Sequence, residues 1–234
     1  MTVQWGSAQP VHGHKNQLQK TLEWSKAHQE ALAVIGIICI LLLIGIPYYL
    51  HSQEQSEKDA QAALSIGQYY LQAPVDPQRG PFKTEMDRLQ EALKTFQRIT
   101  TDYAGTPTAR VARYYSAKCQ FSSGQYAQAY VNFEEASRQL KGTPLADEAA
   151  LGKVLCLAAQ AQWIQAISGY EAFLSENPDS FLAPEARLNL AVAYLKSQNN
   201  PKALEQLKLT AEKYPDTAWG KEAASRLARL QPKS

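Results

Sequence analysis

Acidic pairs are the side chains in this sequence that could carry out acid–base chemistry. Glu134-Glu135 and Asp147-Glu148 each place two carboxyl groups next to each other in the chain. A buried carboxyl pair can divide the roles of general acid and general base, because different environments separate the two pKa values. Both pairs fall on expected helix surfaces, where carboxylates are solvated. An enzyme would instead need a buried pair of titratable groups in a groove.

The sequence also lacks the motifs of several other classes of enzyme and of nucleic-acid binders. His51 is the last histidine, which excludes a histidine-based triad from the 183 residues that follow it in this 234-residue chain. The sequence contains neither a phosphate-binding glycine loop nor an H-E-x-x-H helix. The formal net charge of +2 is too small for the basic surface of a nucleic-acid binder. We therefore expect no enzyme, and no cofactor, metal, nucleic acid or small-molecule substrate.

Two cysteines in the second half of the chain have a structural interpretation. Cys119 and Cys156 are too far apart in sequence for a clustered four-ligand zinc site. They occupy the same position in two successive expected helices, and stacked helices lie about 8–10 Å apart. That separation exceeds the usual Cα distance of a disulfide. We expect both to be reduced core residues.

Residues 31–50 form an uncharged apolar run, ALAVIGIICILLLIGIPYYL. As a helix it would be about 30 Å long, the thickness of the hydrocarbon core of a bilayer. Tyr48 and Tyr49 at its end and Trp24 before it fit interfacial aromatics. No small-x-small cleavage site follows the run, and the residue before Cys39 is not the small one that lipoprotein processing needs. The run predicts a transmembrane helix in contact with the lipid bilayer.

Lysines predict the orientation of this helix. Lys15, Lys20 and Lys26 precede the run, whereas only Lys58 lies in the first twenty residues after it. Since basic flanks stay cytoplasmic, residues 1–30 are expected to be a cytoplasmic tail. In a bacterial source, the remainder would lie beyond the cytoplasmic (inner) membrane of a single-pass protein, in the periplasm or outside the cell.

Four sets of residues recur at a constant spacing of 37 positions. They are Ala92, Ala129, Ala166 and Ala203; Phe96, Phe133, Tyr170 and Leu207; Ala112, Ala149, Ala186 and Ala223; and Thr106, Thr143, Ser180 and Thr217. A period of this size indicates stacked supersecondary units. We expect pairs of antiparallel helices in which alanines allow close contact, large residues fill the adjacent space and hydroxyl residues cap helix starts.

These residues resemble the tetratricopeptide repeat. Gly124, Tyr126, Ala129, Phe133 and Ala136 match the family pattern in order, and later units match at Ala166, Tyr170, Pro178, Leu190, Ala191, Tyr194, Ala203, Leu207 and Pro215. The tryptophan expected early in the first helix is replaced by Arg113, Ala150 and Arg187. The resemblance implies an all-α fold in which one transmembrane helix precedes a right-handed solenoid of helical hairpins.

The predicted organisation has four parts. Residues 1–30 form the cytoplasmic tail, 31–50 the transmembrane helix, 51–83 a stalk helix with a proline-rich loop, and 84–234 the repeats. The helix expected at about 53–73 follows the apolar run directly, so the sequence allows one continuous helix. Ala223, Leu227 and Leu230 would pack a terminal helix whose polar face caps the solenoid.

In relatives of this family the first helices of the repeats line a concave groove for peptide segments. The resemblance places these groove residues at Tyr114, Lys118, Phe121, Glu148, Leu151, Leu155, Leu188, Val192 and Leu195. Most are apolar, and the lysine and asparagine clamp that some relatives use for a C-terminal carboxylate is missing. The alternative for each position is a residue of the core between helices.

The order of tail, membrane helix and repeats is similar to the bacterial ancillary subunit of the Sec translocon. This resemblance implies a membrane-anchored scaffold that assists protein export or folding, with translocon subunits or periplasmic chaperones as partners. The alternative is an envelope-assembly or cell-division scaffold that binds one defined structural protein. The fold alone does not rank these partners.

Overall fold

The structure is a computed structural model that describes residues 20, 23–24, 26 and 28–230. Lys15 and most of the expected cytoplasmic tail lie outside these residues. The helices are α2 (Gln29–Gln72), α3 (Glu85–Asp102), α4 (Pro107–Ser122), α5 (Tyr126–Gln139), α6 (Pro144–Ala159), α7 (Trp163–Glu176), α8 (Ala183–Lys196), α9 (Asn200–Lys213) and α10 (Ala218–Leu230). An isolated bridge between Val75 and Phe82 is the β pairing found in the described residues.

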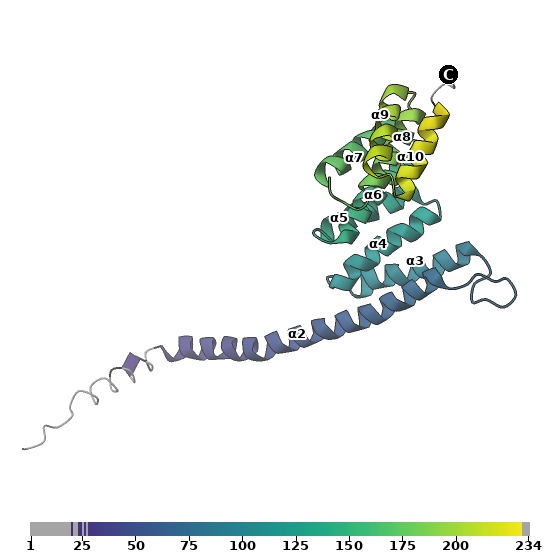
Figure 1. The fold of residues 1–234 in the computed structure, drawn as a ribbon. Helices are drawn as coiled ribbons and strands as arrows, with labels where there is room; N and C mark the ends of the chain where they lie inside the picture. The colour runs from purple at the N-terminus through teal and green to yellow at the C-terminus, as the bar shows by residue number, and fades with distance from the viewer. Residues whose placement is uncertain (1–19, 21–22, 25, 27, 231–234) are drawn as a thin grey trace, which may run out of the picture. The chain divides into compact units, whose positions relative to one another are not determined.

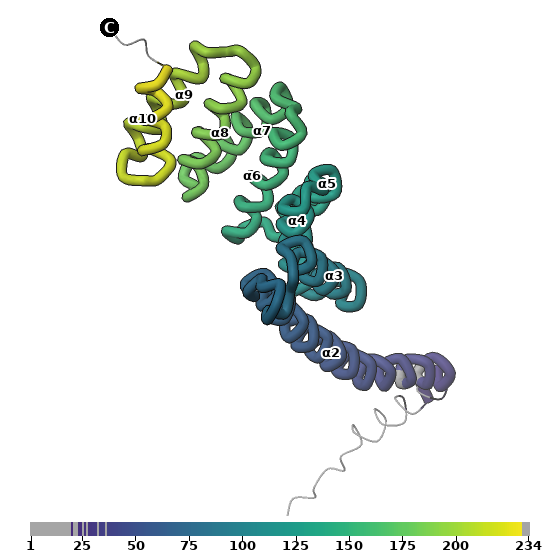
Figure 2. Tube along the Cα trace, turned by 90° about the vertical axis from the view of Figure 1, so that its right-hand side faces the viewer, coloured from purple at the N-terminus to yellow at the C-terminus, as the bar shows by residue number. Residues whose placement is uncertain are grey.

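The helices from α3 onward follow one another as antiparallel hairpins (Figures 1 and 2). Each packs against its neighbours in sequence, and α4 also contacts α6, as α8 contacts α10. Contacts between alternate helices are those of stacked hairpins in a solenoid. The predicted all-α repeat fold is confirmed. Packing divides the chain into residues 1–54 and 55–234, and the second unit contains all the hairpins.

Alanine at two positions of each unit allows the helices to approach closely. All eight alanines of the two predicted columns have 0% of their surface exposed. In the adjacent column Phe96, Phe133, Tyr170 and Leu207 are exposed by at most 4%. Because a larger side chain would separate helices that lie about 8–10 Å apart, the small and large columns together determine the spacing of the solenoid.

The turn inside each hairpin uses a left-handed backbone conformation. Gly124, Ala161 and Gln198 have φ values of 79°, 57° and 63°. They lie 37 residues apart, at the turns predicted near Gly124, Gln162 and Asn199. Glycine adopts this conformation without strain, whereas alanine and glutamine do so at a cost. The tertiary packing of the two later hairpins therefore determines the turn in spite of the local sequence.

The hydroxyl column differs in part from its predicted capping role. Thr106 and Thr217 accept a hydrogen bond from the backbone N–H three residues later, at 3.1 and 3.0 Å. Thr143 makes no such bond, and α8 begins after Leu182, so Ser180 is not its cap. The three threonines of the column share a different hydrogen bond, in which the hydroxyl is the donor. Thr106, Thr143 and Thr217 donate to the carbonyl three residues earlier, at 2.8–2.9 Å, which connects one hairpin to the next.

The C-terminal half of α2 is part of the same packing. Ala60 is fully buried and joins Phe96 and Cys119 in one core cluster. The carboxylate of Glu57 accepts hydrogen bonds from the backbone N–H of Thr108, at 3.2 Å, and from its hydroxyl, at 2.6 Å. A carboxylate at the first turn of α4 satisfies free N–H groups and favours the helix dipole.

The proline-rich loop packs onto α2 and α3. Phe82 is buried edge-on against Tyr70, with ring centroids 5.5 Å apart, and Arg88 donates to the Ala73 carbonyl at 3.3 Å. Thr84 and Asp87 then form a reciprocal capping box that starts α3. The loop is therefore fixed by its own neighbours.

The last helix ends the stack as a largely polar cap. Ala223 is fully buried and Leu227 is half-buried, as predicted, but Leu230 is 43% exposed. Leu230 is the final residue of α10, and no further helix follows to cover it in the described chain. Glu222 and Arg226 form an ion pair at 2.7 Å on the outer side.

Residues within α2 meet the length and composition needed to cross a membrane. The apolar window of α2 has none of its residues buried, although it holds the most hydrophobic side chains of the chain. By length and composition, a helix of this kind could span a bilayer.

Cys119 and Cys156 are buried free thiols, as predicted. Burial raises the pKa of each to about 12. At neutral pH both remain protonated and therefore unreactive toward electrophiles.

We predict that Glu57→Gln destabilises the repeats by about 1 kcal/mol at pH 7, because the two donors of Thr108 bond different oxygens of the carboxylate and glutamine replaces one of these oxygens with an NH2 group, which cannot accept. Burial opposes ionisation of Glu57, but hydrogen bonds from Thr108 and Gln61 outweigh it and lower its pKa below 4.5. The stabilisation is thus present above pH 4.5 and is lost as the pH falls through the lower folded value.

Thermal unfolding of the full chain in detergent, followed by circular dichroism, measures this difference. The variant should melt about 2–4 °C lower at pH 7 and converge with the parent in acid. Glu91→Gln, at an exposed position on α3, is the control. A difference that persists unchanged at acid pH would contradict the role of the Glu57 charge.

Candidate functional site

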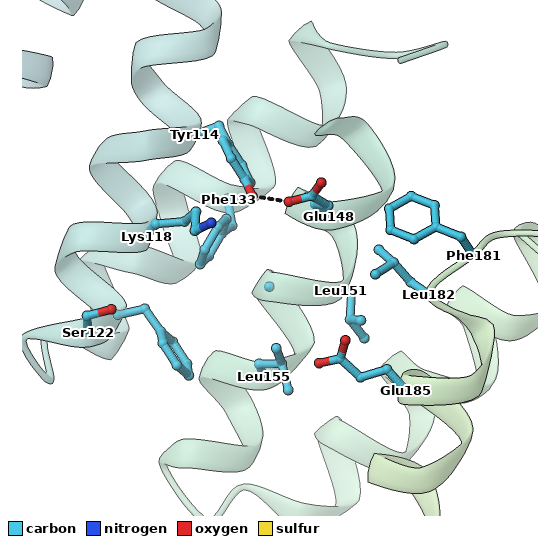
Figure 3. A pocket seen from close by; sticks show the side chains of 12 residues that line it. Tyr114, Lys118, Ser122, Phe133, Glu148, Leu151, Leu155, Phe181, Leu182 and Glu185 are labelled. Carbon is cyan, nitrogen blue, oxygen red and sulfur yellow. Dashed lines mark hydrogen bonds between the residues drawn. The ribbon is translucent and has the colours of Figure 1, made fainter. Parts of the chain in front are cut away.

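One open pocket of about 400 Å³ lies across the first helices of three successive hairpins (Figure 3). Its lining residues come from α4, α5, α6, the α7–α8 turn and the start of α8. They are Tyr114, Lys118, Phe121, Ser122, Phe133, Glu148, Leu151, Gly152, Leu155, Phe181, Leu182 and Glu185. Its volume falls within the roughly 300–1,000 Å³ of typical ligand sites.

Six of the nine predicted groove residues line this pocket: Tyr114, Lys118, Phe121, Glu148, Leu151 and Leu155. The other three, from α8, do not. Leu188 is 4% exposed in a core cluster with Leu207 and Ala223. Val192 and Leu195 are half-buried, and Leu195 packs against the cluster between α6 and α8. A binding role for the nine residues stays a prediction.

A tyrosine and a glutamate connect α4 and α6 at the upper end of the pocket in Figure 3. The Tyr114 hydroxyl donates a hydrogen bond to the Glu148 carboxylate. Burial and the charge of Glu148 both raise the pKa of Tyr114, so its hydroxyl stays protonated. The ammonium group of Lys118 lies over the Tyr114 ring, 5.4 Å from its centroid. These contacts hold Glu148 in the wall of the pocket.

The Phe133 ring packs against the backbone of α6 because residue 152 is a glycine, whereas the preceding unit has Tyr115 at the corresponding position. Tyr115 stacks on Phe96, with ring centroids 5.2 Å apart. One period later, Gly152 faces Phe133, and a Cβ at Gly152 would stand 2.8 Å from a ring carbon. Without a side chain on Gly152, the Phe133 ring approaches the α6 backbone, and although only 4% of its surface is exposed it lines the pocket.

The rim on the α8 side results from a late helix start. Pro107 and Pro144 directly follow the hydroxyl column and begin α4 and α6. Phe181 stands at the corresponding position of the third unit, and α8 begins two residues later, at Ala183. Phe181 therefore lies outside the helix and is 63% exposed.

Glu185 extends from the first turn of α8 toward the Leu151 side of the pocket (Figure 3). Burial, followed by the nearby charge of Glu148, raises the pKa of its carboxyl group. The pocket thus contains two carboxylates and one lysine among its lining residues, which gives it a net negative charge at neutral pH.

Gly152, Phe181 and Glu185 were missed as groove residues, although the sequence contains signals for two of them. Glu185 lies one period after Glu148, so the same spacing that predicts one predicts the other. Phe181 stands where the two preceding units have proline, and such an interruption marks a position where the packing must differ. Gly152 has no such signal, because Tyr115 and Asn189 occupy its position in the neighbouring units. Phe133 was predicted as a core residue, and it is one, yet its ring also lines the pocket.

The pocket lining contains two carboxylates, Glu148 and Glu185, together with the polar side chains of Tyr114, Lys118 and Ser122. Both carboxylates are half-buried and face an open space, and no histidine or cysteine is among the lining residues. No cluster of three or more metal-binding side chains occurs in the part of the chain that the structure describes.

Stacked helical hairpins with a pocket on their first helices define an α-solenoid whose function is to present a surface. The chain belongs to the tetratricopeptide repeat-like family. The tetratricopeptide repeat-like domain matches residues 22–168, more than half of the chain, and a tetratricopeptide repeat matches residues 157–230. Repeats of this family indicate a protein–protein interaction scaffold.

Two solved structures with a similar fold support the assignment of the fold. Two crystal structures of nearly identical TPR-like repeats, assigned to a kinesin light chain of Podosopora anserina, one of them a Q17M variant, are similar at a TM-score of 0.57. Their identity is 15% over 74% of this chain and 85% of theirs. YrrB, a TPR protein with an unusual peptide-binding site, is 20% identical over 58% of this chain and 84% of its own, at a TM-score of 0.31. No curated protein matches the sequence.

We predict that Gly152→Ala destabilises the chain by about 1 kcal/mol, although alanine favours helix formation by a similar amount at an unconstrained site. The added Cβ would displace the Phe133 ring, and overpacking costs roughly 1–3 kcal/mol. Thermal unfolding should show a decrease of about 2–4 °C. Ser168→Ala, at an exposed position of α7, is the control. An unchanged or higher midpoint would show that the ring does not need this space.

Proposed function

We propose that the chain is a membrane-anchored interaction platform whose pocket binds apolar segments of protein partners outside the cytoplasmic membrane. The observation that supports it most is the convergence of six predicted groove residues on one mostly apolar pocket. Exposed Phe181 extends the apolar surface at the rim. An accessible apolar surface of this kind is typical of a site that a partner covers.

The anchor is the apolar part of α2. Its exposed apolar side chains are suited to lipid, and residues 31–50 have the length of a bilayer span. Three lysines before the span and one shortly after it favour a cytoplasmic N-terminus. Tethering would raise the effective concentration of the pocket near other membrane proteins.

Translocon subunits and periplasmic chaperones are the partners that the architecture supports best. The proposed order of tail, span and repeats is similar to that of the bacterial ancillary Sec translocon subunit, and a platform at a translocon exit would meet apolar segments before they fold. An envelope-assembly or cell-division scaffold would instead bind one defined structural protein with the same surface.

Cysteine labelling tests the proposed orientation. Lys141→Cys lies in the exposed turn after α5, and Lys20→Cys lies before the apolar run. In intact bacterial spheroplasts, a membrane-impermeant maleimide should label Lys141→Cys. It should label Lys20→Cys only after the spheroplasts are lysed. Buried Cys119 and Cys156, with pKa values raised to about 12, should contribute little background. The reverse pattern would overturn the orientation.

Photo-crosslinking tests the pocket as the binding surface. A benzophenone amino acid at Phe121 or Leu155 should form adducts in native membranes because both residues line the pocket. Ile164 on α7, which is 77% exposed and does not line the pocket, is the matched control. Adducts with many exported chains or with translocon subunits would support the export role, and one defined envelope protein would support the alternative. The same adducts from Ile164 would contradict a site in the pocket.

A further inference from the structure

Building on the proposed function, we infer which segment chemistry the pocket selects. The geometry points to a partner segment that places a bulky apolar side chain against Phe133 and a lysine or arginine beside Glu185 and Glu148. Such a segment differs in charge from the C-terminal carboxylates that a lysine clamp would hold.

The apolar half of the specificity comes from the side chains of the pocket lining. Phe133, Leu151 and Leu155 line the pocket, and the exposed ring of Phe181 extends this surface at the rim. The Phe133 ring lies against the backbone of α6 at Gly152, so its position is fixed by the fold. A leucine or phenylalanine side chain of the partner would pack in the pocket, against the part of the Phe133 ring that lines it and against Leu155.

The selectivity for a basic residue rests on the charge of the pocket, whose lining has two carboxylates, Glu148 and Glu185, and one lysine, Lys118. Glu148 is held by the Tyr114 hydroxyl, and Lys118 lies over the same tyrosine ring. The neighbouring charge that acts on Glu185 is that of Glu148, a like charge. A cation placed between the two carboxylates would relieve this repulsion, whereas an acidic segment would increase it.

Glu185 is also a suitable position for a test. Burial and the like charge of Glu148 disfavour its ionised form in the folded chain. We therefore expect Glu185→Gln to fold as stably as the parent, which a thermal unfolding measurement on the variant checks. By contrast, Glu148 is hydrogen-bonded within the wall, and its substitution would disturb the site itself.

The first experiment selects ligands from a random dodecapeptide phage library on the full chain in lipid nanodiscs. Selected peptides should share a leucine or aromatic residue within about two positions of a lysine or arginine. Replacement of the apolar residue by alanine should weaken binding about 30-fold or more, which corresponds to the burial of one large side chain.

The second experiment measures one selected peptide against variants by fluorescence anisotropy. Glu185→Gln should weaken binding about fivefold, as expected for a partly buried ion pair. Glu185→Lys should lose the basic peptide and gain affinity for a copy with glutamate in place of its lysine or arginine. Glu176→Gln, an exposed carboxyl at the end of α7, should bind like the parent.

The outcomes separate this inference from the function on which it rests. Peptides that bind the pocket without a basic residue, or with equal affinity for the parent and Glu185→Gln, would overturn the inferred selectivity and leave the platform intact. If no selected peptide crosslinks to benzophenone at Phe121 or Leu155, the pocket is not the binding surface and both proposals fail.

Discussion

Close contact between helices at fully buried alanines is the constraint on which this structure depends. Two alanine columns repeat in four successive units, and every member has no exposed surface. The same distance between helices that excludes a larger side chain requires a large neighbour one turn later, and Phe96, Phe133, Tyr170 and Leu207 supply it. Since each hairpin packs mainly on its neighbours, these contacts determine the spacing of the whole solenoid, and with it the separation of the first helices that line the pocket.

The candidate site occurs where this regular pattern is interrupted. Gly152 stands where the preceding unit has Tyr115, and Phe181 stands where the two preceding units have proline. The first change lets the Phe133 ring pack against the α6 backbone, and the second delays the start of α8 and leaves an aromatic residue at the rim. The recurring columns therefore determine the packing of the hairpins, and the pocket lining includes positions outside those columns.

The sequence predicts the fold better than the site for a physical reason. Helical period and buried alanines are local patterns that recur, so the hairpins, their turns and six of the pocket residues could be located. Contacts between distant segments could not: Glu57 caps α4 across 51 positions of sequence. The hydroxyl column shows the same limit, since the Thr143 side chain was predicted to cap α6 but donates backward to the Leu140 carbonyl and makes no cap bond. The charge of the pocket depends on Glu185, which only the spacing after Glu148 indicates.

The most direct test is an experimental structure of the full chain in nanodiscs with a bound partner segment. Our account predicts that a bulky apolar side chain of the segment contacts the Phe133 ring over Gly152, with a basic group between the carboxylates of Glu148 and Glu185. A segment bound on the second helices of the hairpins, or a pocket that stays empty while the partner is bound elsewhere, would contradict it.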